Sequence, residues 1–365
     1  MSVASDVSAS SASRGEANGV NWRQVFLGVG RRVSKFLDII GFGWLVTLTH
    51  VVIGKDRRQN AKTLWKQLGV PLVAIGLFLA IWAGLAPKVH TSLGGLPGPQ
   101  QVAQQAANLW ADHLAERAKQ RAFLERQDKR NAEIRAADPK AQVKIRPYTG
   151  KPTFLDQIAT SLETVFTGFL FASLVAIPLG ILCGLFVPFN SALNPLVQIF
   201  KPVSPLAWLP IVTMVVSALY VSDDPLFPKS FLISAITVTL CSLWPTLINS
   251  AVGVASIDKD LLNVGRVLRL DWRTKITRLV IPSALPFIFT GLRLSLGVGW
   301  MVLIAAEMLA QNPGLGKFVW DEFQNGSSES LAKIIVAILT IGIIGFVLDR
   351  LMLAVQTAIT YDPNR

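Results

Sequence analysis

The sequence predicts an all-α integral membrane protein with six transmembrane helices, for three reasons. Of the 365 residues, 51% are hydrophobic and only 16% are charged, a composition that soluble domains do not have. The apolar residues occur in blocks of about 19 to 24 residues, each long enough to cross about 30 Å of hydrocarbon as a helix. A basic segment between two of these blocks has a helical pattern of its own, which indicates a structured loop at the membrane surface.

Six apolar blocks define the predicted spans. They cover residues 68–86, 165–187, 203–221, 231–252, 287–309 and 334–355. The chain is expected to divide into five regions: a basic tail (1–66), the first transmembrane helix (67–88), a helical insertion (89–160), the transmembrane core (161–357) and a short cytoplasmic C-terminal tail (358–365).

The N-terminal region carries half of the excess positive charge. The formal net charge is +12, and residues 1–66 hold ten Lys or Arg against four Asp or Glu, which is +6. Basic residues beside a span mark the cytoplasmic side and can lie against anionic membrane lipid. No recognition motif for nucleic acid accompanies this charge, so nucleic acid is not expected as a partner. Residues 1–20 lack an apolar core, which favours a cytoplasmic tail over a signal peptide.

The apolar stretch 39–53 leaves two interpretations open. It is short and has three basic residues close to each end. If it spanned the membrane, one basic flank would lie outside. An interfacial helix is therefore favoured over an additional span.

Residues 89–160 are predicted to form an extracytoplasmic insertion, by alternation from the first span. A helical pattern runs from Gln100 to about Ala137, amphipathic at first and then densely charged, and Asp138-Pro139 ends it. Two interpretations remain, a solvated helical hairpin and a docking surface for a partner protein.

Prolines interrupt two of the predicted spans. Residues 189–202 are expected to form a short cytoplasmic turn, after which the third span opens with Pro202, Pro205 and Pro210. The fourth span contains Trp244-Pro245. Irregular backbone at membrane depth is tolerated where it is buried in protein or lines a water-filled cavity, so these two spans are expected to do one or the other.

The loop before the fifth span is predicted to contain two short amphipathic helices. Asp258 and Asp260 suit a helix N-terminus. An apolar face at i, i+3, i+4 and i+7 follows, formed by Leu261, Val264, Gly265 and Leu268. After a break at Leu270-Asp271, a second face is formed by Trp272, Ile276, Leu279 and Val280. Pro282 is expected to stop this second helix.

No residue pattern predicts catalysis, a cofactor or a metal site. Gly314-Leu315-Gly316-Lys317 lacks the earlier glycine and the following Ser or Thr of an ATP-binding P-loop. Cys183 and Cys241 lie in predicted spans without metal-ligand spacing, so they are expected to be packing residues. The chain is not expected to be an enzyme.

At the loop the chain resembles the permease subunits of bacterial ABC importers. Their cytoplasmic loop follows the pattern EAA, three residues, G, nine residues, I, one residue, LP. Here the pattern starts at 263–265 and ends at Leu279, Ile281 and Pro282, with Asn263 in place of Glu and Arg269 in place of Gly. Further segments resemble the nitrate and bicarbonate branch of the taurine and sulfonate importer family, namely 201–210, 281–286, 289–293, 305–309 and 320–323.

The resemblance implies a multi-pass permease of the bacterial inner membrane that imports nitrate or nitrite by alternating access. Its implied partners are a second copy of itself, cytoplasmic ABC ATPase subunits that hydrolyse the ATP, and a periplasmic or lipid-anchored solute-binding protein. Residues 115–152 look like an insertion relative to the family. If this insertion is a docking surface, the solute-binding protein would be the partner that docks there. The residues assigned to coupling with the ATPase are Asp260, Leu261, Val264, Gly265, Leu268, Arg269 and Trp272.

Other substrates and another class of protein remain as alternatives. Bicarbonate is the second substrate candidate and taurine or an aliphatic sulfonate is the third. A stand-alone secondary transporter would show inverted repeats and acidic residues at mid-membrane, neither of which is visible.

Polar and ionisable residues within the spans are candidates for the translocation pathway, because such side chains are costly there. Neutral donors suit a large, weakly hydrated anion that is held only briefly. The candidates are Ser204, Trp208, Thr213, Trp244, Asn249, Arg293 and Trp300. Arg293 either stabilises the passing anion or snorkels to the cytoplasmic interface. Glu307, about 21 Å farther along the same span, is expected to be a structural partner of backbone amides or of another span.

Overall fold

The computed structural model describes residues 47, 57–91, 94–138, 143, 145–221, 225–327 and 329–360. By its contacts the chain forms two compact units, Met1–Gly69 and Val70–Arg365. The described part of the first unit includes helix α3 (Arg57–Leu64) and a π-helical turn, η1 (Trp65–Gly69). The interfacial helix predicted for 39–53 lies outside the described residues, apart from position 47, as does the predicted tail 1–20.

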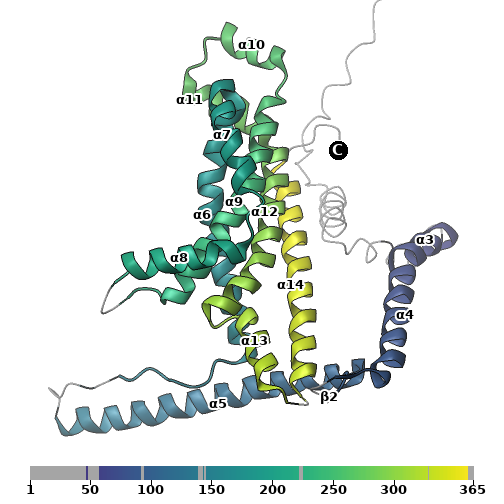
Figure 1. Cartoon of the computed structure of the whole chain (residues 1–365), viewed down its shortest axis with the longest axis vertical. Coiled ribbons are helices and arrows are strands. Elements are labelled where there is room, and N and C mark those ends of the chain that lie inside the picture. The colour runs from purple at the N-terminus through teal and green to yellow at the C-terminus, as the bar shows by residue number, and fades with distance from the viewer. Residues whose placement is uncertain are drawn as a thin grey trace, which may run out of the picture. The chain divides into compact units, whose positions relative to one another are not determined.

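Several helices of the chain are long and apolar enough to cross a membrane (Figure 1). Five segments of the described chain qualify: Ala61–Lys88, Phe154–Leu185, Lys229–Ala255, Trp272–Ala310 and Ser330–Ile359. A sixth span results if α7 (Val187–Phe200) and α8 (Pro205–Leu219), which meet at 101°, are counted as one. The main helices of the five are α4 (Val70–Leu85), α6 (Phe154–Leu185), α9 (Lys229–Ala255), α12 (Ile281–Ala310) and α14 (Ser330–Ile359). The predicted all-α membrane fold is confirmed.

Helices α6, α9 and α12 form the centre of the bundle. A Cβ atom on Gly180 of α6 would lie 2.6 Å from the carbonyl oxygen of Leu247 in α9, so the two backbones approach too closely for a larger residue. Fully buried Val165, Val238 and Leu303 bring the three helices together in one apolar cluster. Close packing at small residues is how helices associate in a membrane, where lipid removes the hydrophobic driving force.

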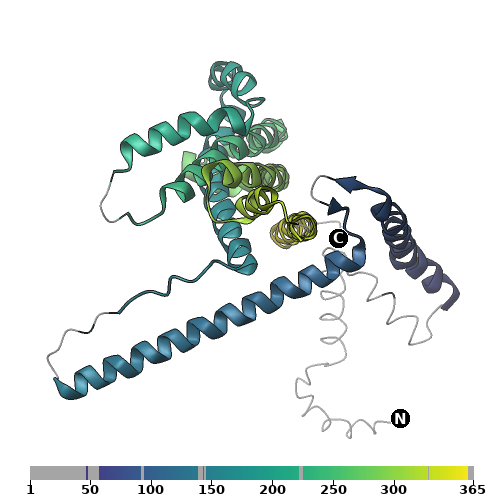
Figure 2. The ribbon, with the colours of Figure 1, turned by 60° about the horizontal axis from the view of Figure 1, so that its bottom comes forward.

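The third predicted span is not one straight helix. Residues 189–200, predicted as part of a turn, belong to α7, and α8 leaves it at a sharp bend (Figures 1 and 2). Pro188 lies in the first turn of α7, where its missing N–H is no loss. Leu193 and Val197 then pack against α9 and hold this helix in place. The prolines from 202 to 205 therefore mark a bend between two helices.

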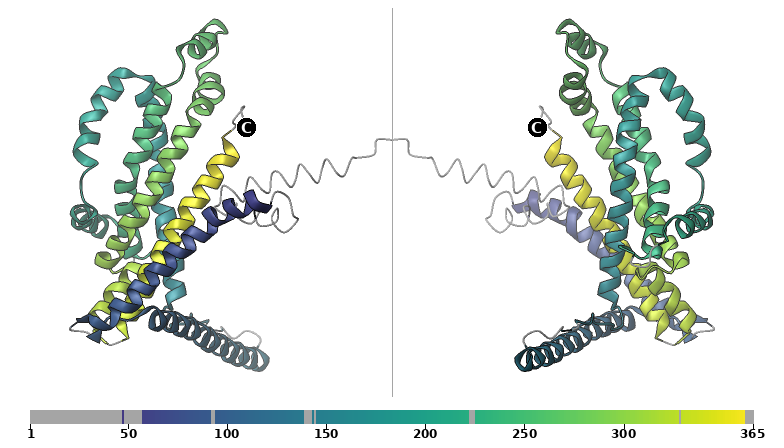
Figure 3. Two further views of the ribbon diagram at one scale, coloured as in Figure 1. Left: turned by 90° about the vertical axis from the view of Figure 1, so that its right-hand side faces the viewer. Right: turned by 90° about the vertical axis from the view of Figure 1, so that its left-hand side faces the viewer.

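The predicted insertion contains one long helix, α5 (Pro99–Ala137), close to the predicted limits of Gln100 and about Ala137. At 1.5 Å per residue it is about 58 Å long. It crosses the end of the bundle opposite to the loop around residue 265 (Figures 1 and 3). A 3-10 turn, η2 (Ala86–Lys88), and two antiparallel strands, β1 (His90–Thr91) and β2 (Gly94–Gly95), connect α4 to α5. Val102 and Leu109 attach the first half of α5 to the bundle.

The chain returns from α5 as an extended segment, so the second helix of the predicted hairpin is not found in the described residues 143 and 145–153. The side-chain amide of Gln127 donates to the carbonyl oxygen of Arg146 (2.9 Å) and accepts from its N–H (2.8 Å). Tyr148 donates to Glu116 at 2.6 Å, which lowers the pKa of Glu116 and raises the pKa of Tyr148. The outer part of α5 and the segment 145–150 that is hydrogen-bonded along it form what we call the arm.

The loop at the other end forms α10 (Lys259–Val267), α11 (Trp272–Lys275) and a π-helical turn, η3 (Ile276–Val280). The break between the two predicted short helices is therefore present. Pro282, however, does not stop the second one, because η3 continues directly into α12 and Pro282 lies in the first turn of that helix. Helix α12 ends at Gln311, which has a left-handed φ of 56°, and α13 (Leu315–Asn325) follows.

Candidate functional site: the α10 loop and polar groups among the spans

One face of α10 is attached to the start of α12. Asp258 caps α10 by accepting a hydrogen bond from the N–H of Asp260 (2.9 Å). Gly265 is buried, and a Cβ atom there would lie 3.3 Å from Leu279 Cδ1 in η3. Leu262 packs on the buried cluster that contains Leu279. The position of α10 is thus tied to that of α12.

The outer edge of α10 is apolar and exposed. Leu261, Val264 and Leu268 are 42%, 52% and 64% exposed, although the sequence pattern placed them on one face with Gly265. Gly265, by contrast, is buried and faces the helix bundle, so it does not share the exposed surface of the other three residues. We call Leu261, Val264 and Leu268 the outer edge of α10. Apolar side chains exposed together on a short helix are typical of a surface that binds a groove in another protein.

The turn after α10 is held by its own caps and by one aromatic contact. Arg269 is exposed and has a left-handed φ of 49°. Asp271 accepts a hydrogen bond from the N–H of Thr274 (3.4 Å), and this cap lowers the pKa of Asp271. Trp272 stacks on Phe186 at the end of α6, with ring centres 5.8 Å apart. The loop is therefore attached at two points, to α12 through Gly265 and to α6 through Trp272.

Two predicted pathway residues, Trp208 and Trp244, each contact Phe200 near the bend between α7 and α8. The ring centre of Phe200, in α7, lies 5.7 Å from that of Trp208 in α8 and 6.3 Å from that of Trp244 in α9. Both indole N–H groups are buried and have no hydrogen-bond acceptor among the residues that the structure describes. Buried donors without an acceptor are rare because they cost free energy, so these two indole groups differ from the other predicted pathway residues.

The other neutral candidates already have hydrogen-bond partners. Ser204 caps α8 by accepting from the N–H two residues on, at 3.3 Å. Thr213 and Asn249 each donate to the carbonyl oxygen four residues earlier, both at 2.8 Å. Trp300 is buried and donates to the carbonyl oxygen of Ile341 in α14 at 3.0 Å. Their polar groups serve the fold.

Arg293 pairs with Asp349 between α12 and α14. Its Nε and Nη2 atoms donate to the two carboxylate oxygens of Asp349, the second at 2.7 Å. The two side chains are 37% and 38% exposed. Asp349 was not among the predicted site residues. The signal was present, because Asp349 is an acidic residue inside an apolar block.

Glu307 is a fully buried carboxyl group that joins three helices. Ser161 of α6 donates to it, with Oγ at 2.8 and 2.9 Å from the two carboxyl oxygens, and the N–H of Gly316 donates at 2.9 Å. The N–H of Leu315 donates in turn to Ser161 Oγ (2.9 Å). A side chain at Gly314 or Gly316 would collide with Glu307. The predicted structural role of Glu307 is confirmed. Gly314 and Gly316, whose segment does not match an ATP-binding P-loop, lie at the N-terminus of α13 next to the Glu307 carboxyl group.

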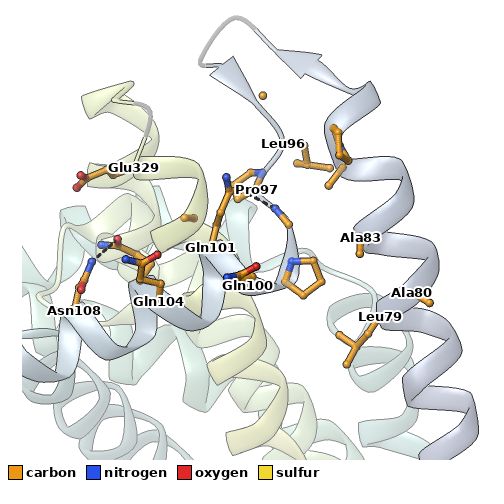
Figure 4. A pocket seen from close by; sticks show the side chains of 17 residues that line it. Leu79, Ala80, Ala83, Leu96, Pro97, Gln100, Gln101, Gln104, Asn108 and Glu329 are labelled. Carbon is orange, nitrogen blue, oxygen red and sulfur yellow. Dashed lines mark hydrogen bonds between the residues drawn. The ribbon is translucent and has the colours of Figure 1, made fainter.

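A cavity of about 1050 Å³ lies beside the start of α5 (Figure 4). One wall is formed by small and apolar residues of α4, and another by the amide side chains Gln100, Gln101, Gln104 and Asn108. Glu329, beside the start of α14, also lines it, and none of its lining residues is basic. None of the predicted pathway residues lines this cavity.

The matched relatives of the chain are membrane transport proteins. The family model for the binding-protein-dependent transport system inner membrane component matches residues 176–361. The nitrate import permease protein NrtB of Leptolyngbya laminosa is 36% identical over 209 residues, which are 57% of this chain and 70% of that protein. NrtB of Synechococcus elongatus is 32% identical over 281 residues, 77% of this chain and 86% of that protein. The bicarbonate transport system permease protein CmpB of the same species is 37% identical over 201 residues (55% and 67%).

Replacement of Glu307 by alanine is expected to destabilise the protein, because Ser161 Oγ and the N–H of Gly316 would lose their acceptor while buried. Each unsatisfied buried donor costs about 1–3 kcal/mol. Thermal unfolding of the purified protein in detergent should therefore show a clearly lower Tm. Glu307→Gln keeps one acceptor oxygen and should lose less. Equal Tm values for wild type and Glu307→Ala would contradict the role assigned to this carboxyl group.

Proposed function

The chain belongs to the family of binding-protein-dependent transport system inner membrane components, and on that premise we propose that it is the permease subunit through which an ATP-driven importer carries nitrate or nitrite. It is an ABC importer permease of the nitrate and bicarbonate group. The observation that carries the proposal is the α10 loop, which exposes an apolar edge and is attached to two spanning helices.

Nitrate is preferred to bicarbonate on the length of the match. The alignment covers 86% of the nitrate relative of Synechococcus elongatus and 67% of the bicarbonate relative from the same species. The degrees of identity do not favour nitrate. Nitrate and bicarbonate are both small, planar, monovalent oxyanions, so one pathway would suit either, and bicarbonate is the second candidate. Taurine or a sulfonate is the third.

The substrate is tested by uptake of labelled nitrate into cells that lack their own transporter and express this chain with its ATPase subunits and solute-binding protein. We expect ATP-dependent uptake that unlabelled nitrate or nitrite blocks and that bicarbonate and taurine do not. Competition by bicarbonate or taurine would keep the class and change the substrate. Uptake without the ATPase subunits would indicate a secondary transporter and contradict the proposal.

The outer edge of α10 would lie in a groove of the ATPase subunit. A displacement of α10 would then pass to α12 through the contact of Gly265 with Leu279, and to α6 through the stack of Trp272 on Phe186. Helices α6 and α12 meet again at Glu307, so they would move as one body. Alternating access would follow when the cavity between two copies of the permease changes the side that it faces.

This role also sets an orientation in the bacterial inner membrane. The α10 loop would face the cytoplasm with the ATPase, and the basic N-terminal region would lie on the same side. Helix α5 lies at the opposite end of the spans, which supports an extracytoplasmic insertion (Figure 3). The solute-binding protein would approach from that side.

The double substitution Leu261→Asp with Leu268→Asp is expected to abolish ATP-dependent uptake and leave membrane insertion intact. It places charges on the outer edge of α10 and does not touch the inner face at Gly265. The matched control, Leu261→Met with Leu268→Met, keeps the edge apolar and should retain uptake. The measurements are uptake and the amount of ATPase subunit that co-purifies. Retained uptake in the aspartate variant would rule out this docking surface.

For the pathway we propose the indole pair of Trp208 and Trp244. Their N–H groups are buried without acceptors and are neutral, so they would hold an anion weakly enough to release it. The bend between α7 and α8 places polar backbone beside them, which suits a water-lined route. The remaining candidates, Ser204, Thr213, Asn249 and Trp300, would position the helices around the route.

Replacement of Trp208 or Trp244 by phenylalanine, which keeps an aromatic ring and removes the donor, is expected to lower the rate of nitrate uptake by about tenfold or more, the effect of losing one hydrogen bond to a charged group. Trp300→Phe is the control, because that indole already donates to Ile341. It should lower the Tm with little effect on the KM for uptake. Wild-type uptake kinetics in both Trp208→Phe and Trp244→Phe would contradict the assignment.

A further inference from the structure

The ion pair of Arg293 and Asp349 lies inside the membrane-spanning region. Each residue is six positions, or about 9 Å, inside the end of its apolar block. A charged pair at this depth that is more than a third exposed on the single chain would be costly against lipid. The surface that carries it must therefore face water or another protein chain.

A cavity of about 430 Å³ opens beside this pair. It lies between α12 and α14, and four of its lining residues are polar or charged: Thr290, Arg293, Asp349 and Gln356. The rest of the lining is apolar, from Leu294, Gly297, Val298 and Met301. A space of this size accommodates a small oxyanion with several waters. The large cavity beside α5, by contrast, has an acidic residue and no basic one in its lining.

The lining of the cavity holds two charged residues of opposite sign, Arg293 and Asp349. Arg350, next to Asp349, has its guanidinium 5.0 Å from the ring centre of Phe346, and its charge also acts on the Asp349 carboxylate. Arg350 does not line the cavity, so the lining itself, with one positive and one negative residue, carries no net charge. Attraction of an anion must therefore come from the hydrogen-bond donors of Arg293 and not from an excess of positive charge.

The guanidinium of Arg293 keeps donors available beyond the ion pair. A guanidinium has five N–H groups, and Arg293 uses one on Nε and one on Nη2 for Asp349. Nη1 has no acceptor among the described residues. An anion in the cavity could therefore accept hydrogen bonds from Arg293 without first breaking the ion pair, while Asp349 weakens the attraction by its own charge.

We propose that Arg293 and the cavity beside it form a transient binding station for the transported monovalent oxyanion, with Asp349 as a positioning residue that limits how tightly the anion is held. This inference rests on the proposed function and adds a second contact point, on α12 and α14, to the indole pair on α8 and α9. A station that both attracts and releases is what conduction requires, since an anion bound tightly would not leave.

The main test replaces the pair by apolar residues, Arg293→Met with Asp349→Leu, in the complete transporter reconstituted in proteoliposomes. Apolar replacement of both members of an ion pair is generally tolerated by the fold. We expect an unchanged Tm and unchanged assembly of two copies by light scattering. ATP-dependent nitrate uptake should fall by about tenfold or more, the factor that corresponds to one charge-assisted hydrogen bond. Uptake within twofold of wild type would show that the pair only fastens α12 to α14, and would overturn the station.

A second variant, Asp349→Asn, separates binding from release. With the carboxylate charge removed, Arg293 should hold the anion longer, so the KM and the maximal rate of nitrate uptake should both fall by about threefold or more. A purely structural role would leave the KM unchanged, and an unchanged KM would overturn the role of Asp349. Loss of dimer assembly in the apolar variant would assign the cavity to contact between copies.

Uptake by the wild-type complex distinguishes a failure of the binding station from a failure of the proposed transport function. If wild type carries neither nitrate nor bicarbonate, the proposed function is wrong and the station is overturned with it. If wild type carries an anion and the apolar variant carries it equally well, the function stands and only the station is overturned.

Discussion

The carboxyl group of Glu307 is the point at which α6, α12 and α13 are joined. A buried carboxyl group requires donors, and here Ser161 supplies one from α6 and the N-terminus of α13 supplies another at Gly316. This arrangement forces α13 to begin close against α12, which is why neither Gly314 nor Gly316 has room for a side chain. Because the hydrogen bonds leave little freedom at this end, one small polar cluster holds α6 and α12 together here.

At the opposite end the same two helices are joined again, by apolar and aromatic contacts. Gly265 lets α10 lie against Leu279, and Trp272 stacks on Phe186. Between these ends, close contact at Gly180 holds α6 to α9. A short surface helix fixed to a pair of helices that is clamped at both ends is suited to transmit movement rather than absorb it. The two candidate anion contacts lie on helices beside this pair or shared with it, one on α8 with α9 and the other on α12 with α14.

Hydrophobic blocks and helix caps were sufficient to predict most of the helices, because a bilayer admits few other backbones. The sequence pattern therefore placed α5, α10 and the last span within a few residues. It was wrong at Pro282, which was expected to stop a helix and lies in the first turn of α12, and at residues 189–200, which were expected to be part of a turn and belong to α7. Arg293 and Asp349 are 56 positions apart in the sequence. A local sequence pattern does not indicate which charged residues on different helices form an ion pair. The contact of Trp208 and Trp244 through Phe200 depends on the 101° bend and was equally out of reach.

The Gln127 side chain has a further consequence for how the molecule unfolds. It imitates the edge of a β-ladder, satisfying both the N–H and the carbonyl of Arg146, so the extended segment needs no neighbouring strand. Tyr148 also donates a hydrogen bond to Glu116, so these stabilising contacts of the outer part of the arm are made between its own residues and not with the spans. The outer part of the arm is therefore expected to open before the spans do, although both belong to one compact unit. Heat should melt the arm first and leave the spans intact, so a single two-state transition would not describe this chain.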